Sequence, residues 1–268
     1  YEIASCLVGS EMCIRDRDVV ARRDAVLAAN AKDVERGRAN GTSEALLDRL
    51  TLTPKRIDAL AAALRDLAGL PDPVGSVARG QTLPNGLRMR QVHVPLGVVG
   101  AIYEARPNVT LDIAGLALKS GNAVILRGGS AAAATNTVLV NLIRDSLDTV
   151  GLPSDAVQTI DQYGRPGANF LMKARGKVDV LIPRGGRDLI QNVVTNAAVP
   201  VIETGEGNVH IYLDESAREE MAVDILLNAK TQRPSVCNTV ETLLVHANSA
   251  AAPQVLSALA AAGVRLHT

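Results

Sequence analysis

Residues 119–130 read KSGNAVILRGGS, and this stretch decides the fold. Residues 123–126 form a short apolar run, which is typical of a strand that is buried on both faces of a parallel sheet. A pair of glycines follows the run, and a helical pattern over residues 130–147 comes next. The stretch therefore predicts a strand, a tight glycine corner and a helix.

The same alternation continues on both sides of this stretch. We expect further strands over residues 98–103, 178–182 and 199–202, and further helices over residues 110–119 and 187–197. Strands separated by helices in this way require right-handed crossovers and lie parallel to one another. The pattern predicts an α/β fold with a doubly wound parallel sheet.

Helical segments and an arm precede the sheet. Residues 18–37 have an apolar face at helical spacing, and residues 42–43 offer a cap for a short helix that ends at residue 50. Thr53 and Pro54 provide an N-cap and a first-turn proline for a third helix. The turn signal Asn85-Gly86 precedes residues 87–94, whose loose alternation favours an edge or arm strand.

The character of the sequence changes after Glu203. We expect strands over residues 209–213 and 239–246, helices over residues 216–230 and 249–262, and the start of another strand at residues 264–266. These patterns predict a domain over residues 18–203 that binds the cofactor and the start of a catalytic domain over residues 204–268. A strand that is only begun leaves a sheet edge unpaired, so we expect the chain to be truncated and this fragment to be inactive.

Composition excludes several classes of function. The formal net charge is zero and aromatic residues make up 2% of the chain, which disfavours binding to nucleic acid or to an anionic membrane. No apolar run approaches the ~20 residues that span a bilayer. The 3 cysteines form no disulfide framework and no CxxC pair, so we expect no metal. We expect a soluble protein of a reducing compartment, the cytoplasm.

Residues 1–17, YEIASCLVGSEMCIRDR, differ from the rest of the chain. They have no helix cap, no steady period and no signal-peptide order, and they contain Cys6 and Cys13. Residues 6–17 look like a translated sequencing adapter, so we expect a segment that is not native and has no disulfide. The alternative is an irregular native arm.

Two glycine corners follow strands of the expected sheet. Glycines at such corners let backbone N–H groups approach a diphosphate, and the start of a helix favours negative charge. Either corner alone could be structural, but the pair indicates a dinucleotide, although no GxGxxG motif occurs. The residues expected to bind the cofactor are Arg127, Gly128, Gly129, Ser130, Arg184, Gly185 and Gly186.

Cys237 is the candidate nucleophile, because it is a lone thiol between a helical pattern and an apolar strand. Its alternative role is that of a small buried apolar residue. Asn108 offers an amide that can donate to an oxyanion, or else it caps the helix that follows. Glu203 is a candidate acid or base, or else a solvated carboxylate.

Five motifs carry a resemblance to a known family: PLGVVGAIYEARPNVT at 95–110, KSGNAVILRGGS at 119–130, VLIPRGG at 180–186, ETG at 203–205 and RPSVCN at 233–238. They resemble the γ-glutamyl phosphate reductases of the aldehyde dehydrogenase superfamily over essentially residues 18–268. One departure is Val209, where relatives often have cysteine. The resemblance also implies a longer protein, with an oligomerisation hairpin beyond Thr268.

The resemblance implies NADPH-dependent reduction of L-glutamyl 5-phosphate to L-glutamate 5-semialdehyde with release of phosphate, the second step of proline biosynthesis. It implies that Cys237 is the nucleophile, that Asn108 is its oxyanion partner, and that Glu203 stands where hydrolytic relatives carry a general base. NADPH is expected rather than NADH, because Arg127 can pair with a 2′-phosphate and Ser130 stands where NAD-using relatives tend to carry a glutamate. A homo-oligomer and functional coupling with glutamate 5-kinase are expected of the full-length protein.

Two alternatives remain open at this point. The first is a cysteine-dependent acyl hydrolase or acyltransferase that pairs Cys237 with His93, His210, His246 or His267, although no spacing selects one of them and the glycine corners stay unexplained. The second is an inactive fragment of the reductase.

Overall fold

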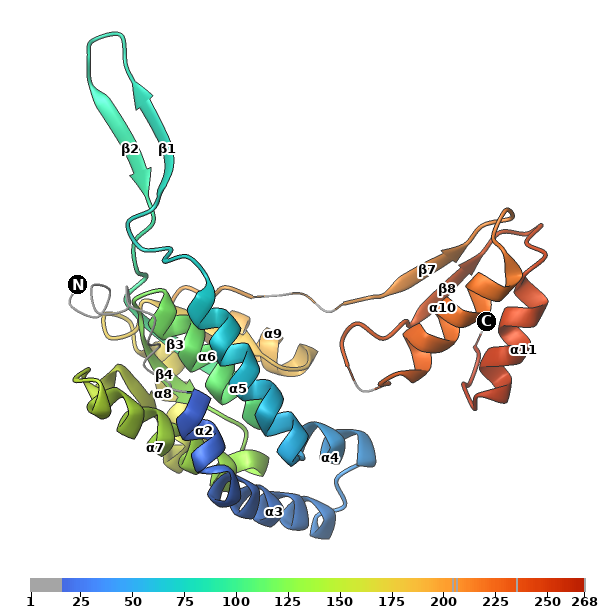
Figure 1. The fold of residues 1–268 in the computed structure, drawn as a ribbon, viewed down its shortest axis with the longest axis horizontal. Coiled ribbons are helices and arrows are strands. Elements are labelled where there is room, and N and C mark those ends of the chain that lie inside the picture. Colours follow the sequence, from blue (N-terminus) through green and yellow to red (C-terminus); the bar gives the residue numbers. More distant parts are fainter. Residues whose placement is uncertain (1–15, 204, 206, 235, 268) are drawn as a thin grey trace. The chain divides into compact units, whose positions relative to one another are not determined.

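The computed structural model describes residues 16–203, 205, 207–234 and 236–267 (Figure 1). The chain divides into two compact units, Tyr1–Thr204 and Gly205–Thr268, and each is described by itself. Cys6 and Cys13, with the prediction that they form no disulfide, lie outside the described residues.

The first unit begins with the helices α2 (Asp16–Ala21), α3 (Arg23–Ala39), α4 (Glu44–Leu50) and α5 (Pro54–Gly69). The single helix expected over residues 18–37 is divided by a turn at Arg22, although the Arg22 amide still donates to the carbonyl of Asp18 at 3.0 Å. Helix α2 also starts at Asp16, inside the segment 1–17 that was predicted not to be native. The predicted start of α5 is confirmed, since the Thr53 hydroxyl accepts from the Arg56 amide at 3.2 Å.

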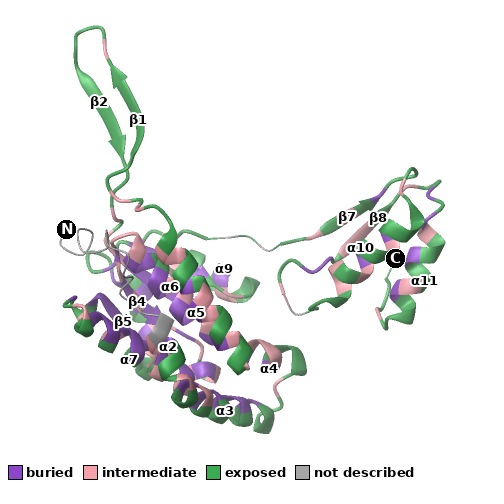
Figure 2. Ribbon diagram, in the orientation of Figure 1, coloured by how far each residue is buried: buried purple, intermediate pink, exposed green. Residues whose placement is uncertain are grey.

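An exposed arm follows α5. The strands β1 (Val77–Thr82) and β2 (Arg88–Val92) pair antiparallel, and all their residues are exposed (Figure 2). Gly86 has a φ of 84°, a left-handed conformation that favours glycine in the turn between them. The arm strand predicted near residues 87–94 is confirmed. Its partner β1 was not predicted, because VARGQT has no apolar alternation.

Four parallel strands form the central sheet in the order β5-β4-β3-β6. They are β3 (Val98–Tyr103), β4 (Ala123–Arg127), β5 (Val157–Thr159) and β6 (Val180–Arg184). The strand expected at residues 199–202 is wrong, because the chain forms only an isolated parallel bridge there, between Leu181 and Val201. β5 was not predicted, because three residues are too few to show a period.

Helices cover both faces of this sheet. Helices α6 (Pro107–Lys119) and α7 (Ala133–Thr149) lie on one face, and α8 (Gly164–Lys173) and α9 (Arg187–Asn196) lie on the other. Alternate residues of β3 enter the two cores: Val99, Ala101 and Tyr103 pack in the first core, and Ile102 packs in the second. The doubly wound α/β fold is confirmed. α8 was not predicted, because it begins with the helix-breaking residues GRPG.

The second unit contains β7 (His210–Leu213), α10 (Glu219–Thr231), β8 (Thr242–Val245) and α11 (Ala252–Ala261). The two strands are parallel and in register from His210 opposite Thr242 to Leu213 opposite Val245. Their apolar residues pack with both helices around Leu226 and Val255. The strand expected at residues 264–266 is wrong, because those residues pair with no neighbouring strand and have no regular structure.

Along the described part of the chain, no helix is both long enough and apolar enough to cross a membrane.

Candidate active site

The loops that follow β3, β4 and β6 lie at one edge of the central sheet, because parallel strands all end on the same side. The chain places β4 and β5 on one side of β3 and β6 on the other, so the strand order reverses between β3 and β6. Open α/β sheets bind ligands at such a reversal, outside the carboxyl ends of the strands. The residues at this edge include Asn108, at the start of α6, residues 127–130 and residues 184–186.

The corner after β4 is closely packed. A Cβ atom at Gly128 would lie 2.0 Å from Asn136 Nδ2, and one at Gly129 would lie 2.9 Å from the backbone nitrogen of Ala105. Both glycines are therefore required by the packing. The Gly128 amide donates to Asp161 Oδ1 at 2.7 Å, so this amide is not available to a ligand.

A buried carboxylate from another helix occupies the start of α7. Asp33 on α3 is fully buried and accepts from the amides of Ala134 at 3.2 Å and Thr135 at 2.8 Å. It also accepts from the Thr135 hydroxyl at 2.7 Å and pairs with Arg36. This arrangement caps α7 internally. The first amides of α7 are therefore engaged by Asp33. A ligand at the corner after β4 would bind the side chains of Arg127 and Ser130 instead.

Arg127 is half-buried, and its Nε atom is buried with no hydrogen-bond partner among the described residues. Its charge lies close enough to Asp161 to lower the pKa of that carboxyl, although burial is the larger effect and raises it. A buried guanidinium nitrogen without a partner costs free energy, which an anionic ligand can offset.

A buried series of hydrogen-bonded polar side chains supports the corner after β4. The Tyr103 hydroxyl lies 2.8 Å from Thr110 Oγ1, which donates to Asn136 Oδ1 at 3.0 Å, and Asn136 Nδ2 donates to Asp161 Oδ2 at 3.1 Å. Burial raises the pKa of Tyr103 above its ordinary range. These hydrogen bonds link β3, α6 and α7 to the 3₁₀ turn η3 (Asp161–Tyr163). They hold Asp161, which accepts from the Gly128 amide and so fixes its position.

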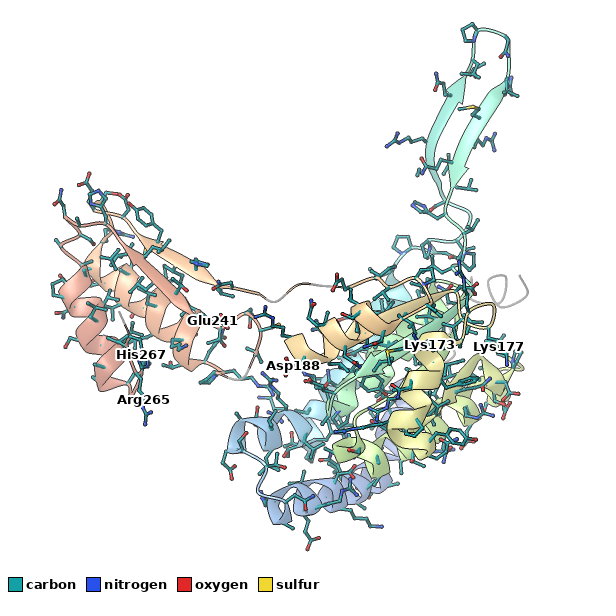
Figure 3. The ribbon with its side chains drawn as sticks, turned by 180° about the vertical axis from the view of Figure 1, so that it is seen from behind. Lys173, Lys177, Asp188, Glu241, Arg265 and His267 are labelled. Carbon is teal, nitrogen blue, oxygen red and sulfur yellow. The ribbon has the colours of Figure 1, made fainter. Side chains whose placement is uncertain are left out.

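The corner after β6 contacts the loop after β3. The Gly186 amide donates to Glu104 Oε1 at 2.9 Å, and a Cβ atom at Gly185 would lie 2.8 Å from Glu104 Cδ. The Glu104 amide donates to the carbonyl of Arg184 at 3.1 Å. Helix α9 starts here, with Asp188 in its first turn (Figure 3).

Asn108 is the second residue of α6, and its Nδ2 donates to Asp112 Oδ2, one turn later, at 3.1 Å. Burial raises the pKa of Asp112, while the hydrogen bond from Asn108 and the charge of Arg184 lower it. The alternative role of Asn108 as a cap before the helix is therefore wrong, because it lies within α6. Glu203 is exposed after the bridge at Val201.

Cys237 lies in the second unit, between α10 and β8, and is an exposed free thiol. The alternative that it is a buried apolar residue is therefore wrong. Its segment is folded: the Thr239 hydroxyl donates to the Arg233 carbonyl at 2.8 Å, and Lys230 Nζ donates to the Val240 carbonyl at 2.9 Å. The backbone of Gly207 approaches closely, since a Cβ atom there would lie 2.9 Å from the Cys237 carbonyl oxygen.

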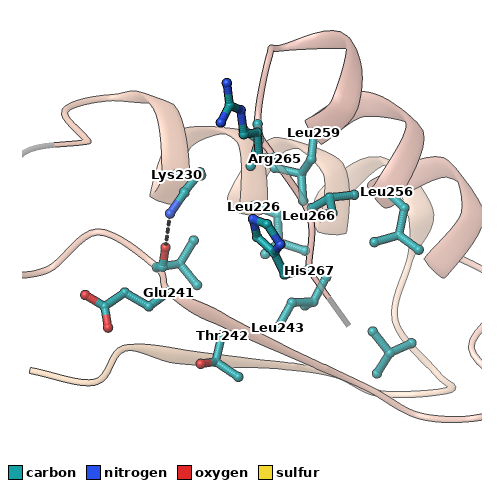
Figure 4. A pocket seen from close by; sticks show the side chains of 13 residues that line it. Leu226, Lys230, Glu241, Thr242, Leu243, Leu256, Leu259, Arg265, Leu266 and His267 are labelled. Atoms are coloured by element: carbon teal, nitrogen blue, oxygen red, sulfur yellow. Dashed lines mark hydrogen bonds between the residues drawn. The ribbon is translucent and has the colours of Figure 1, made fainter.

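A separate pocket lies within the second unit, between α10, α11 and β8. Figure 4 shows Leu226, Leu243 and Leu259 among its lining residues, and the dashed line marks the hydrogen bond that Lys230 donates to the Val240 carbonyl. Cys237 is not among the described residues that line it. This pocket is therefore distinct from the segment that carries the candidate nucleophile.

The sequence pattern of the aldehyde dehydrogenase family matches residues 42–267. The chain belongs to the aldehyde dehydrogenase family. Members of this family use a nicotinamide cofactor. Solved structures agree: a γ-glutamyl phosphate reductase from Thermotoga maritima is 40% identical with a TM-score of 0.85, and the match covers 98% of this chain and 67% of that one. The yeast enzyme of the same name is 31% identical, with a TM-score of 0.68 and the same coverage.

Curated relatives carry the same name. The γ-glutamyl phosphate reductase of Leifsonia xyli is 64% identical over 253 residues, which cover 93% of this chain and 60% of the relative. That of Kineococcus radiotolerans is 61% identical over 251 residues, 93% of this chain and 58% of the relative. The aldehyde dehydrogenase chain described here thus spans about 58–60% of the length of these relatives.

The residues that support the site were not predicted from the sequence. Asp161 follows β5, a strand that was not predicted, and Asn136 reaches it from the first turn of α7, so no local pattern marks either residue. Glu104 lies in the motif at 95–110, but no role was predicted for it. The contact between Asn108 and Asp112 could have been predicted from their spacing, because residues four apart share one face of a helix.

Proposed function

We propose that this chain carries the cofactor-binding and nucleophile-bearing parts of an enzyme that reduces L-glutamyl 5-phosphate to L-glutamate 5-semialdehyde with NADPH. The observation that carries the proposal is the exposed thiol of Cys237, held in a hydrogen-bonded turn of a chain whose curated relatives are named γ-glutamyl phosphate reductase. An accessible thiol on a fixed backbone is what covalent catalysis on an acyl phosphate requires.

The corner after β4 fits one end of the cofactor. The unpartnered Nε of Arg127 and the exposed Ser130 offer a cation and a hydroxyl for the 2′-phosphate of NADPH. Since the Gly128 amide and the first turn of α7 are engaged internally, we assign the diphosphate to the corner after β6, at Gly185 and the start of α9, where Glu104 engages the Gly186 amide but not the first turn of the helix. Arg184 adds a positive charge there.

The chemistry is assigned to Cys237 and Asn108. The Cys237 thiolate attacks the acyl carbon, phosphate leaves, and a thioester forms. Asn108 Nδ2 and the Cys237 amide donate to the oxyanion, and removing one such donor typically costs ~3 kcal/mol. The bound NADPH supplies the hydride. The thiohemiacetal that results on Cys237 releases the aldehyde and regenerates the thiol. No water is consumed, so Glu203 has no hydrolytic role in this direction.

The hydrolase alternative is less well supported. His210 Nδ1 lies 2.7 Å from the Asn208 carbonyl oxygen, and His246 Nδ1 lies 3.6 Å from Glu215 Oε2. These contacts leave Nε2 of both rings available, but no hydrogen bond joins Cys237 to a histidine among the described residues. A cysteine hydrolase needs a base hydrogen-bonded to its thiol.

The test is an assay of the protein expressed from its complete reading frame. L-glutamate 5-semialdehyde and phosphate should reduce NADP⁺ with the wild type and not with Cys237→Ala, while both proteins bind NADPH alike. Release of glutamate from the acyl phosphate at equal rates with and without NADPH would support the hydrolase and contradict the proposal.

Four expectations from the sequence stay predictions: the preference for NADPH over NADH, a homo-oligomer, functional coupling with glutamate 5-kinase, and a cytoplasmic location. The domain that begins at residue 204 is likewise proposed to be the start of the catalytic domain.

A further inference from the structure

Asp112 holds the side chain of Asn108 from the next turn of α6. The distance from Asn108 Nδ2 to Asp112 Oδ2 is 3.1 Å, and both residues are half-buried. Burial raises the pKa of Asp112, and the charge of Arg184, at the end of β6, offsets part of that rise, which places a positive charge near this carboxyl. Asp112 belongs to none of the motifs or roles assigned above.

The chemistry of the two side chains fixes the orientation of the amide. An ionised carboxylate only accepts hydrogen bonds, whereas the end of an asparagine side chain has a donating nitrogen and an accepting oxygen of nearly equal size. Facing Asp112, Asn108 can turn only its nitrogen toward the carboxylate. The amide group then cannot rotate by half a turn and place its oxygen where the nitrogen lies.

This orientation matters because an oxyanion needs a donor. A rotated amide would present a carbonyl oxygen to a developing negative charge and repel it, whereas an N–H group stabilises it. The nitrogen of Asn108 has two hydrogens, so one can bond Asp112 while the other remains for a ligand.

We propose that Asp112 is a positioning residue that holds the Asn108 amide with its nitrogen, rather than its oxygen, available to the oxyanion. The inference rests on the proposed function, since it acts through the role assigned to Asn108. It predicts that Asp112 affects turnover only while Asn108 is present.

The experiment is a double-mutant cycle on the protein from its complete reading frame. Asn108→Ala should lower kcat about a hundredfold. Asp112→Ala should lower it about tenfold, the typical effect of one hydrogen bond to a charged group. Asp112→Asn should lie between Asp112→Ala and the wild type, because an amide can still accept from Asn108. In the Asn108→Ala background, Asp112→Ala should have no further effect.

Asp148→Ala is the control, because Asp148 is an exposed aspartate on the neighbouring helix α7. It should keep the wild-type kcat, and all variants should keep the wild-type KM for NADPH and the wild-type melting temperature. Equal loss from Asp112→Ala in both backgrounds, or no loss in the wild-type background, would overturn the inference. An unchanged kcat in Asn108→Ala would overturn the role of Asn108 itself, and the inference with it.

Discussion

Replacing Gly207 with alanine adds one methyl group against the backbone of the candidate nucleophile. The added Cβ would lie 2.9 Å from the Cys237 carbonyl oxygen, whereas ordinary contact begins at 3.4 Å. The difference, 0.5 Å, is the separation of the two backbones that restores an ordinary contact.

A displacement of this size should be visible in catalysis. Misplacing a reacting group by ~1 Å costs about a hundredfold in rate, so half that displacement should cost about tenfold in kcat. The assay is reduction of NADP⁺ with L-glutamate 5-semialdehyde and phosphate, together with NADPH binding, which should not change.

Gly205→Ala is the matched control. It changes a glycine of the same loop, and no described atom lies within 4 Å of the Cβ it adds. It should keep the wild-type kcat. A wild-type kcat in Gly207→Ala, or an equal loss in Gly205→Ala, would refute the inference that the close contact between the Gly207 and Cys237 backbones holds Cys237 in place.

Three further predictions concern the first unit. Arg127→Ala should weaken NADPH binding about tenfold or more and leave NADH binding nearly unchanged, because it removes a charged partner of the 2′-phosphate; equal weakening of both, measured by fluorescence titration, would contradict this. Asp33→Ala should lower the free energy of unfolding by about 3 kcal/mol, since it leaves buried amides of α7 without an acceptor; denaturant titration should show little change for the exposed Asp24→Ala. Burial raises the pKa of Asp161 above its ordinary 3.8 in the folded state, so the stability linked to its protonation is complete below 3.8 and is lost as pH rises through the raised pKa. Thermal melts should therefore show that Asp161→Asn gains stability relative to the wild type over that rise, and parallel curves would contradict the assignment.

The sheet could be predicted because its inner strands are buried on both faces. Residues 98–103 and 123–126 are short apolar runs followed by glycine or helix signals, and the structure has strands there. β5 and α8 could not be predicted in the same way. β5 has three residues, and α8 starts at a Gly-Arg-Pro-Gly run that normally ends a helix.

The chemically prominent residues of the candidate site could be read from the sequence, but their supporting contacts could not. The corner at Arg127 is recognisable in the sequence, because a glycine pair follows a predicted strand. Its attachment to Asp161, and the capping of α7 by Asp33, join residues 33 and 102 positions apart. Such contacts depend on packing between elements, which local patterns do not encode.

The central claim is that Cys237 carries the acyl group during the reaction. The direct measurement is mass spectrometry of the protein after incubation with enzymatically generated L-glutamyl 5-phosphate and no NADPH, quenched in acid and digested with trypsin. Trypsin cleaves after Lys230 and Arg265 but not between Arg233 and Pro234, so residues 231–265 form one peptide. We predict that this peptide gains the mass of one glutamyl group at Cys237, and that NADPH added before the quench removes it. A peptide that stays unmodified while the enzyme turns over, or glutamyl on another residue, would contradict the account.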